Sequence, residues 1–331
     1  LQYASLQHID QKSQLRNPDS RILFSEFAGG PLLANYADSY EGIGCGDLVR
    51  FSKCLWEVEI LKPEWQSLRG TSIETNTSSG LESIIFWQDG RGAIYQLAEA
   101  LRDRLKNTWQ RGSQAWGKHG IAVNRMGDLY AERYFGEIFD SNIAAIIPKN
   151  QEHLASIWHF LKSPVFRDEV RKIDQALKVT NVTFLKVPFD LEYWQRIADV
   201  AGLLPEPYSN DPTQWLFKGY PVDSTSPLQV AVARLLGYQW PQQTADELDA
   251  CASKYGIVCL PSVGGAEPGV ERLRALLAMA YGEAWSPALQ ERLLADVGYS
   301  GKGLEAWLRD GFFEQHCRLF HNRPFIWQVW D

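Results

Sequence analysis

The stretch from residue 203 to residue 226 constrains the fold most, because it separates two parts of the chain with different hydrophobic patterns. It is rich in Pro, Asn, Asp and Ser, which is typical of a boundary between domains. Before it, short β-type runs alternate with amphipathic helical patterns, whereas the pattern after it is almost wholly helical. At 331 residues the chain is long enough for two domains. We predict an α+β fold with a mixed α/β domain at residues 1–200, a linker at 201–226 and a mainly helical domain at 227–331.

Periodicity and turn residues predict the elements of both parts. Runs of β-branched and aromatic residues bounded by Gly or Pro predict strands at residues 42–61 (strand, turn, strand), 83–87, 120–124, 134–139, 144–147 and 182–187. Apolar residues at helical spacing predict helices at residues 94–109, 154–161, 166–177 and 191–202. Ser-Pro pairs mark two later helix starts. In the last part, one helix is predicted to begin at 227, and three others are predicted at 269–281, 287–297 and 303–321.

Charge is distributed unevenly along the chain. The net charge is -7, which argues mildly against nucleic acid as a partner. Residues 100–196 nevertheless carry 15 Lys and Arg against 11 Asp and Glu, so the middle of the chain is basic. A local basic face matters more for phosphate contact than the total charge does. The acidic, helical last third is therefore predicted to serve as scaffold or for docking between domains.

Cysteine usage and hydropathy indicate the cellular compartment in which the protein is expected. The five cysteines include no CxxC pair, so the sequence indicates neither a disulfide framework nor a zinc site. Reduced thiols in a cytoplasmic protein are the simple interpretation. No apolar run approaches the roughly 18 residues of a membrane-spanning helix, so we predict no membrane association. Sequence motifs for a nucleophilic serine, a phosphate-binding loop, a kinase or a metalloprotease are also missing.

Several segments follow one another in a characteristic order. In the first part they are residues 42–58 (GIGCGDLVRF, then LWEV), 79–90, 116–148, 154–166 and 179–188. In the last part the most distinctive run is FFEQHCRLFHNRPFIW at 312–327. In this order they resemble the target-recognition region and tail of class I N6-adenine DNA methyltransferases. Similar proteins are the large single-chain type II restriction–modification enzymes and the adenine methyltransferases of phage-defence islands such as BREX.

The resemblance implies sequence-specific recognition of duplex DNA, with residues 1–200 as the target-recognition (DNA specificity) domain. It also implies a parent adenine-specific DNA methyltransferase whose catalytic domain, with its S-adenosylmethionine, lies upstream of Leu1 and is a partner of this chain. Such a domain needs a Gly-rich turn and an Asn-Pro-Pro-aromatic tetrapeptide that holds the flipped base. The nearest match is NDPT at 210–213, which lacks the second Pro and the aromatic residue. We therefore expect no catalytic residue, metal or cofactor in this chain itself.

Basic and amide side chains beside the predicted sheet are the candidates for DNA contact. Arg and Lys neutralise phosphates, while Arg and Asn can also read the edges of purines. The candidates for phosphate contact are Arg50, Lys53, Arg102, Lys106, Arg111 and Lys118. The candidates for base contact are His119, Asn124 and Arg125, with the turn residues Lys178, Thr180 and Asn181 as a further group. For each, an ordinary solvated surface or turn role is the alternative; Trp109 and Trp116 are expected to be buried.

Two other functions stay open on the sequence alone. In the first, the chain is a protein-interaction or scaffold region that docks other subunits of a defence system, which suits its net charge of -7. In the second, it is a self-contained enzyme whose site carries no recognisable motif. Salt-dependent binding of duplex DNA would separate DNA recognition from the scaffold alternative.

Overall fold

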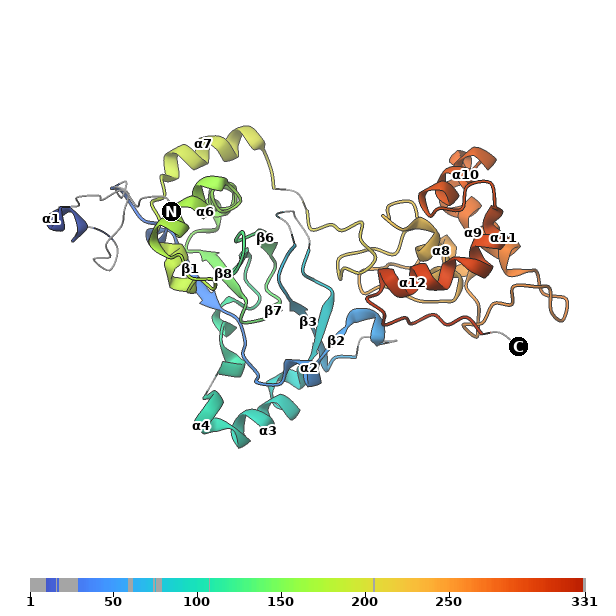
Figure 1. Cartoon of the computed structure of the whole chain (residues 1–331), viewed down its shortest axis with the longest axis horizontal. Helices are drawn as coiled ribbons and strands as arrows, with labels where there is room; N and C mark the ends of the chain where they lie inside the picture. The colour runs from blue at the N-terminus through green and yellow to red at the C-terminus, as the bar shows by residue number, and fades with distance from the viewer. Residues whose placement is uncertain are drawn as a thin grey trace, which may run out of the picture. The chain divides into compact units, whose positions relative to one another are not determined.

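The computed structural model confirms the α+β class (Figure 1). It describes residues 10–15, 17, 29–58, 62–73, 75, 79–106, 108–204 and 206–329. Two four-stranded sheets lie within these ranges, together with helices. The chain divides into two compact units. Unit 1 comprises Leu1–Phe51, Gln66–Gly80 and Ile85–Pro207, and unit 2 comprises Ser52–Trp65, Leu81–Ile84 and Tyr208–Asp331.

The first sheet is antiparallel and lies in unit 1. Its strands, in spatial order, are β1 (Ala37–Glu41), β8 (Ile143–Pro148), β5 (Gly120–Asn124) and β6 (Ala131–Tyr134). Every residue of β5, β6 and β8 is buried, so both faces of this sheet are covered. Burial on both faces explains why β5 and β8 have nearly continuous apolar sequences instead of alternating polar and apolar residues.

Helices from later in the chain cover one face of this sheet. They are α5 (Leu154–Leu161), α6 (Pro164–Ile173) and α7 (Leu191–Ala201), and α6 and α7 lie beside the β1 end of the sheet in Figure 1. The Ser163 hydroxyl accepts a hydrogen bond from the Phe166 N–H, and Pro164 occupies the first turn. Therefore α6 begins two residues before the helix predicted at 166–177, and it ends at Ile173. Phe160, Phe166 and Trp194 pack with the sheet into one core.

The second sheet has the strand order β2-β4-β3-β7. Its members are β2 (Ser52–Cys54), β4 (Ser83–Phe86), β3 (Trp65–Arg69) and β7 (Ile138–Phe139), with β3 and β7 parallel. The short helices of unit 1 are α1 (Gln11–Gln14), α2 (Leu48–Phe51), α3 (Ala93–Ala100) and α4 (Arg102–Leu105).

Several elements predicted before the linker were wrong in detail. The strand, turn and strand predicted at 42–61 are replaced, within the described residues, by the helix α2, the short strand β2 and the 3-10 helix η3 (Leu55–Glu57). The helix predicted at 94–109 is interrupted at Leu101 and ends at Lys106, whose φ of 49° is left-handed. The strand predicted at 134–139 is divided between β6 and β7. The strand predicted at 182–187 is instead a 3-10 helix, η8 (Asn181–Lys186). There Thr183 bonds back to Thr180 through both backbone and hydroxyl groups, so local turn chemistry overrides the β-type composition.

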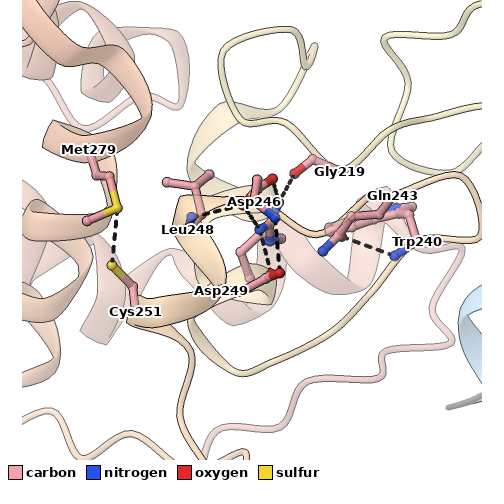
Figure 2. A network of polar contacts seen from close by, with 9 residues as sticks. Gly219, Trp240, Gln243, Asp246, Leu248, Asp249, Cys251 and Met279 are labelled. Carbon is pink, nitrogen blue, oxygen red and sulfur yellow. Dashed lines mark hydrogen bonds and ion pairs between the residues drawn. The ribbon is translucent and has the colours of Figure 1, made fainter.

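Unit 2 is mainly helical. Its helices are α8 (Pro227–Leu235), α9 (Gly269–Tyr281), α10 (Pro287–Asp296), α11 (Gly303–Asp310) and α12 (Phe312–Leu319). The single helix predicted at 303–321 is two helices that meet at Gly311. A Cβ atom at Gly311 would lie 2.5 Å from the Tyr299 ring, so this junction requires glycine. Arg234 of α8 is buried and pairs with Asp246 and Asp249. Figure 2 shows these two carboxylates in their polar network.

Two segments from early in the sequence also belong to unit 2. Trp56 is buried against Phe320, with the ring centroids 5.0 Å apart, and its Nε1–H donates to the Arg323 carbonyl at 2.9 Å. The Leu81 N–H donates to Gln214 Oε1 at 2.9 Å. Unit 2 therefore differs from the predicted domain at 227–331, because it also includes these segments and much of the predicted linker. Such long-range pairing leaves no trace in local composition.

Candidate nucleic-acid interface

One end of the first sheet brings together side chains from distant parts of the sequence. Strand β1 ends at Glu41, β5 ends at Asn124, and β8 begins just after Asn142. Because β8 runs antiparallel to both neighbours, these three chain segments meet at the same end of the sheet. We call this group the sheet-end cluster; its members are Glu41, Arg111, Arg125, Asn142, Lys178 and Asn181.

Arg125 lies inside the sheet-end cluster and holds it together. Its side chain is 7% exposed, and its Nε donates to the Val179 carbonyl at 3.0 Å. Its Nη1 donates to the Ser141 carbonyl at 2.8 Å and lies 2.5 Å from Glu41 Oε1. This guanidinium is therefore buried and bonds protein groups through its Nε and Nη1 atoms.

Arg111 shares the Glu41 carboxylate but faces solvent. Its Nη1 lies 3.0 Å from the same Oε1 atom, and its side chain is 41% exposed. Two guanidinium groups on one carboxylate leave an excess positive charge at this edge. The backbone passes close to Glu41 at Gly112, the residue after Arg111. There φ is +81°, and a Cβ atom would lie 2.7 Å from the Glu41 carbonyl oxygen. Glycine at this position therefore allows the approach that places Arg111.

A tight turn presents Asn142 next to Lys178. The Asp140 carboxylate accepts the Asn142 N–H at 2.6 Å, and the Asn142 carbonyl accepts the Arg125 N–H at 2.8 Å. The Lys178 ammonium donates to Asn142 Oδ1 at 2.9 Å. Burial raises the pKa of Asp140, and the Asn142 hydrogen bond and the Lys178 charge oppose that rise. Lys178 is exposed, so it adds a second solvent-facing cation to the cluster.

The other predicted residues of the 178–181 turn have structural partners. Asn181 Nδ2 donates to the Ser39 carbonyl of β1 at 3.0 Å, and Asn181 is half-buried. The Thr180 hydroxyl pairs with the Thr183 hydroxyl at 2.8 Å at the start of η8. Turn chemistry, the alternative weighed for these two residues, accounts for their contacts.

The prediction of base contact by Asn124 and Arg125 needs correction. Both residues are 6% exposed, and the Asn124 amide accepts the Ser72 N–H at 3.1 Å and donates to the Ser72 carbonyl at 2.7 Å. Both ends of this amide bond the Ser72 backbone inside the protein, so burial keeps it away from a base edge. We therefore assign Asn124 and Arg125 a structural role.

Lys118 and His119 lie at the opposite end of β5 from Arg125. Six residues at roughly 3.3 Å each separate His119 from Arg125 by about 20 Å along the strand. Both Lys118 and His119 are exposed, and the His119 ring meets the Phe135 ring edge-on at 6.0 Å. They are therefore not part of the sheet-end cluster.

The remaining candidates are also separate from the cluster. Arg102 and Lys106 are exposed on and just after α4, which lies far from α6 and α7 in Figure 1, and Arg102 pairs with Glu99 at 3.0 Å. Arg50 is exposed in α2, with its guanidinium 5.2 Å from the centre of the Phe51 ring. Lys53 is exposed in β2 and belongs to unit 2. As expected, Trp109 is buried; Trp116 is partly buried.

Sequence reasoning missed Glu41 and Asn142. The run Asp140-Ser141-Asn142 carries a turn signal that could have indicated an exposed polar side chain next to a strand. Glu41 carries no such signal, because a carboxylate at a strand end is paired only when distant arginines fold onto it.

No protein-family model matches this sequence, and no curated protein matches it either. Within the described residues, no three His, Cys, Asp or Glu side chains are grouped so that they could hold a metal ion. In the same part of the chain, every helix is too short or too polar to cross a membrane.

Proposed function

We propose that this chain recognises duplex DNA sequence-specifically on behalf of an N6-adenine DNA methyltransferase of a restriction–modification or phage-defence system. The resemblance of its ordered segments to target-recognition regions supports the proposal. The observation that carries it in the structure is the sheet-end cluster, where the exposed cations Arg111 and Lys178 lie beside the ends of the buried strands β5 and β8.

The cluster suits contact with a phosphate backbone. Arg111 lies between the 3-10 helices η5 (Thr108–Gln110) and η6 (Ser113–Ala115), and Lys178 forms a β-bridge with Met126. Both are held beside the sheet by contacts with Glu41 and Asn142. Glu41 neutralises only one of the two arginines that it contacts, so the exposed edge stays cationic. Phosphate contacts by these residues would position the duplex, and amide groups beside them would reach the base edges.

Methyl transfer itself belongs, in this proposal, to the catalytic domain of the parent protein. That domain would bind S-adenosylmethionine and hold the flipped adenine, while this chain selects the site. The partners of the chain are accordingly double-stranded DNA and the methyltransferase domain. The purified 331-residue chain should show no methylation of DNA when S-adenosylmethionine is added.

Fluorescence anisotropy with labelled duplexes over a series of salt concentrations tests the proposal. Wild type should bind duplex with an affinity that falls as salt rises, because each phosphate contact releases counterions. Arg111→Gln and Lys178→Gln should each weaken binding and lower the slope of log affinity against log salt by about 0.9. Lys162→Gln is the matched control, since Lys162 is an exposed cation that lies over the Trp158 ring at the end of α5.

Absence of duplex binding even at low salt, or binding without a salt slope, would overturn the proposal and favour the scaffold alternative. An equal loss in Lys162→Gln and Arg111→Gln would show that the sheet-end cluster is not the contact surface.

A further inference from the structure

The turn that begins β8 holds one amide side chain in a fixed orientation at the sheet-end cluster. Asn142 is anchored through its backbone N–H to Asp140 Oδ1 and through its carbonyl to the Arg125 N–H, at 2.6 and 2.8 Å. Its side chain is anchored by Lys178, whose Nζ donates to Oδ1 at 2.9 Å. These contacts fix the position of the residue and the rotation of its amide.

Lys178 also decides which side of the amide faces outward. An ammonium group can only donate, so the oxygen of Asn142 must face Lys178 and the NH₂ group must face away. Within the described residues the NH₂ group donates to no protein atom, and Asn142 is half-buried rather than enclosed. The amide oxygen keeps a second lone pair, so a donor and an acceptor remain side by side.

The amides of Asn124 and Asn181 and the guanidinium of Arg125 bond other protein groups near this end of the sheet. Asn124 bonds both sides of the Ser72 backbone, and Asn181 donates to Ser39. Arg125 is buried among carbonyl groups and Glu41. Among these amides, Asn142 is the one whose NH₂ group and second oxygen lone pair are oriented by Lys178 but bond no other group in the described residues.

We propose that Asn142 determines specificity by reading an adenine in the major groove, and that Lys178 positions its amide. This inference rests on the proposed function. An asparagine amide matches adenine because its oxygen accepts from the N6 amino group while its NH₂ group donates to N7. The neighbouring cations Arg111 and Lys178 place phosphate contacts beside the base contact, as recognition of a duplex requires.

Selection of preferred sites from a pool of randomised duplexes, followed by affinity measurement on single-base variants, tests the inference. Wild type should favour adenine at one position of its site. Asn142→Ala should lower the discrimination there by about tenfold to a hundredfold, the range of one bidentate base contact. Asn142→Asp keeps the acceptor for Lys178 but loses the donor to N7, so its preference should move from adenine toward cytosine, whose N4 group donates.

Three further variants separate base reading from other effects. Arg111→Gln should weaken all duplexes alike without changing the preferred base. Lys178→Met should lower discrimination, whereas Lys178→Arg, which keeps a donor, should restore it. Asn150→Asp is the matched control, because Asn150 is an exposed amide that caps a turn before α5, and aspartate caps equally well.

The outcomes distinguish this inference from the proposed function. Unchanged base preference in Asn142→Asp, with duplex binding by wild type intact and thermal unfolding unaltered, would overturn the role of Asn142 alone. Failure of wild type to bind any duplex would overturn the proposed function first, and the role of Asn142 with it.

Discussion

Residues of the same type have different roles in this chain because their burial differs. Arg111 and Arg125 contact the same carboxylate oxygen, yet only Arg111 faces solvent. Asn124 and Asn142 are both amides at one end of the sheet, but Asn124 is buried against the Ser72 backbone. A basic or amide side chain is therefore a candidate for DNA contact only after the fold has left its polar atoms unoccupied.

Removing the Asn124 amide should destabilise unit 1. Asn124→Ala leaves the Ser72 N–H and carbonyl without these partners, and each buried group that loses its hydrogen bond costs about 1–3 kcal/mol. Urea unfolding should show a lower midpoint, whereas the exposed control Gln110→Ala should unfold like wild type. Equal midpoints for Asn124→Ala and wild type would contradict the structural role assigned to this residue.

Acid should destabilise unit 2 through His316. This residue is fully buried; its Nε2 accepts the Ile326 N–H, and burial lowers its pKa to about 4. Because the pKa is lower in the folded state than the ordinary value of 6.5, the unfolded chain takes up the proton first as pH falls. The contribution of neutral His316 to the unfolding free energy is therefore fully present above pH 6.5. It should fall by about 3 kcal/mol as the pH drops toward 4.

Urea unfolding at pH 7 and pH 4.5 measures this effect. His316→Gln removes the titrating group, so its unfolding free energy should change less between the two pH values than that of wild type. An identical change in both proteins would show that other groups cause the acid sensitivity.

At the scale of elements, a buried ion network joins α8 to the 3-10 helix η9 (Glu247–Cys251) in unit 2. Arg234 donates to the Gly219 carbonyl at 3.1 Å and lies 2.5 Å from Asp246 and 2.9 Å from Asp249. Figure 2 shows Asp246, Asp249 and Gly219 around this point. Burial alone would raise the pKa of Asp246, but the hydrogen bonds and charge of Arg234 lower it below its ordinary value. The network fixes how η9 meets the helical core.

Replacing Arg234 should test this junction. Arg234→Met leaves two carboxylates without their cation and should lower the unfolding free energy by about 3–5 kcal/mol. Arg309→Met is the matched control, because Arg309 pairs with Asp310 on the surface, where such pairs contribute little to stability. Chemical denaturation followed by circular dichroism measures both; similar losses would show that burial does not set the strength of the Arg234 network.

At the scale of the whole molecule, segments that are far apart in the sequence belong to the same compact unit. Unit 2 contains Ser52–Trp65 and Leu81–Ile84 as well as the residues from Tyr208 onward. Leu55, Trp56, Ile84 and Phe320 form a small buried cluster of their own. The early motif LWEV and the late motif FHNRPF are therefore neighbours within one unit.

Unit 2 should depend on its early segments for stability. Trp56→Ala should lower its unfolding free energy by about 3–5 kcal/mol, because it opens a cavity beside Phe320. Trp327→Ala is the control in the same unit, since Trp327 is 69% exposed and should change stability little. A fragment of residues 208–331 should unfold at a lower temperature than unit 2 in the whole chain; equal unfolding temperatures would contradict this dependence.

The sequence by itself predicted the α+β class, the strands β5 and β8, and the starts of α8 and α10. These elements depend on local periodicity and helix capping, which are determined by residues that are close in the sequence. It also predicted Arg111 and Lys178 as candidates, because basic residues can be read directly from composition. It did not predict that the helix at 94–109 breaks or that residues 182–187 form a 3-10 helix.

Only the tertiary structure decided which candidates remain available and which segments lie together. Asn124 and Arg125 have the right chemistry for base contact, but packing placed their polar atoms against Ser72, Val179 and Ser141. Glu41 and Asn142 entered the site because three strands end at one edge of the sheet. Pairing between distant strands and burial of polar groups depend on contacts across the fold, and the residues next in sequence carry little information about those contacts.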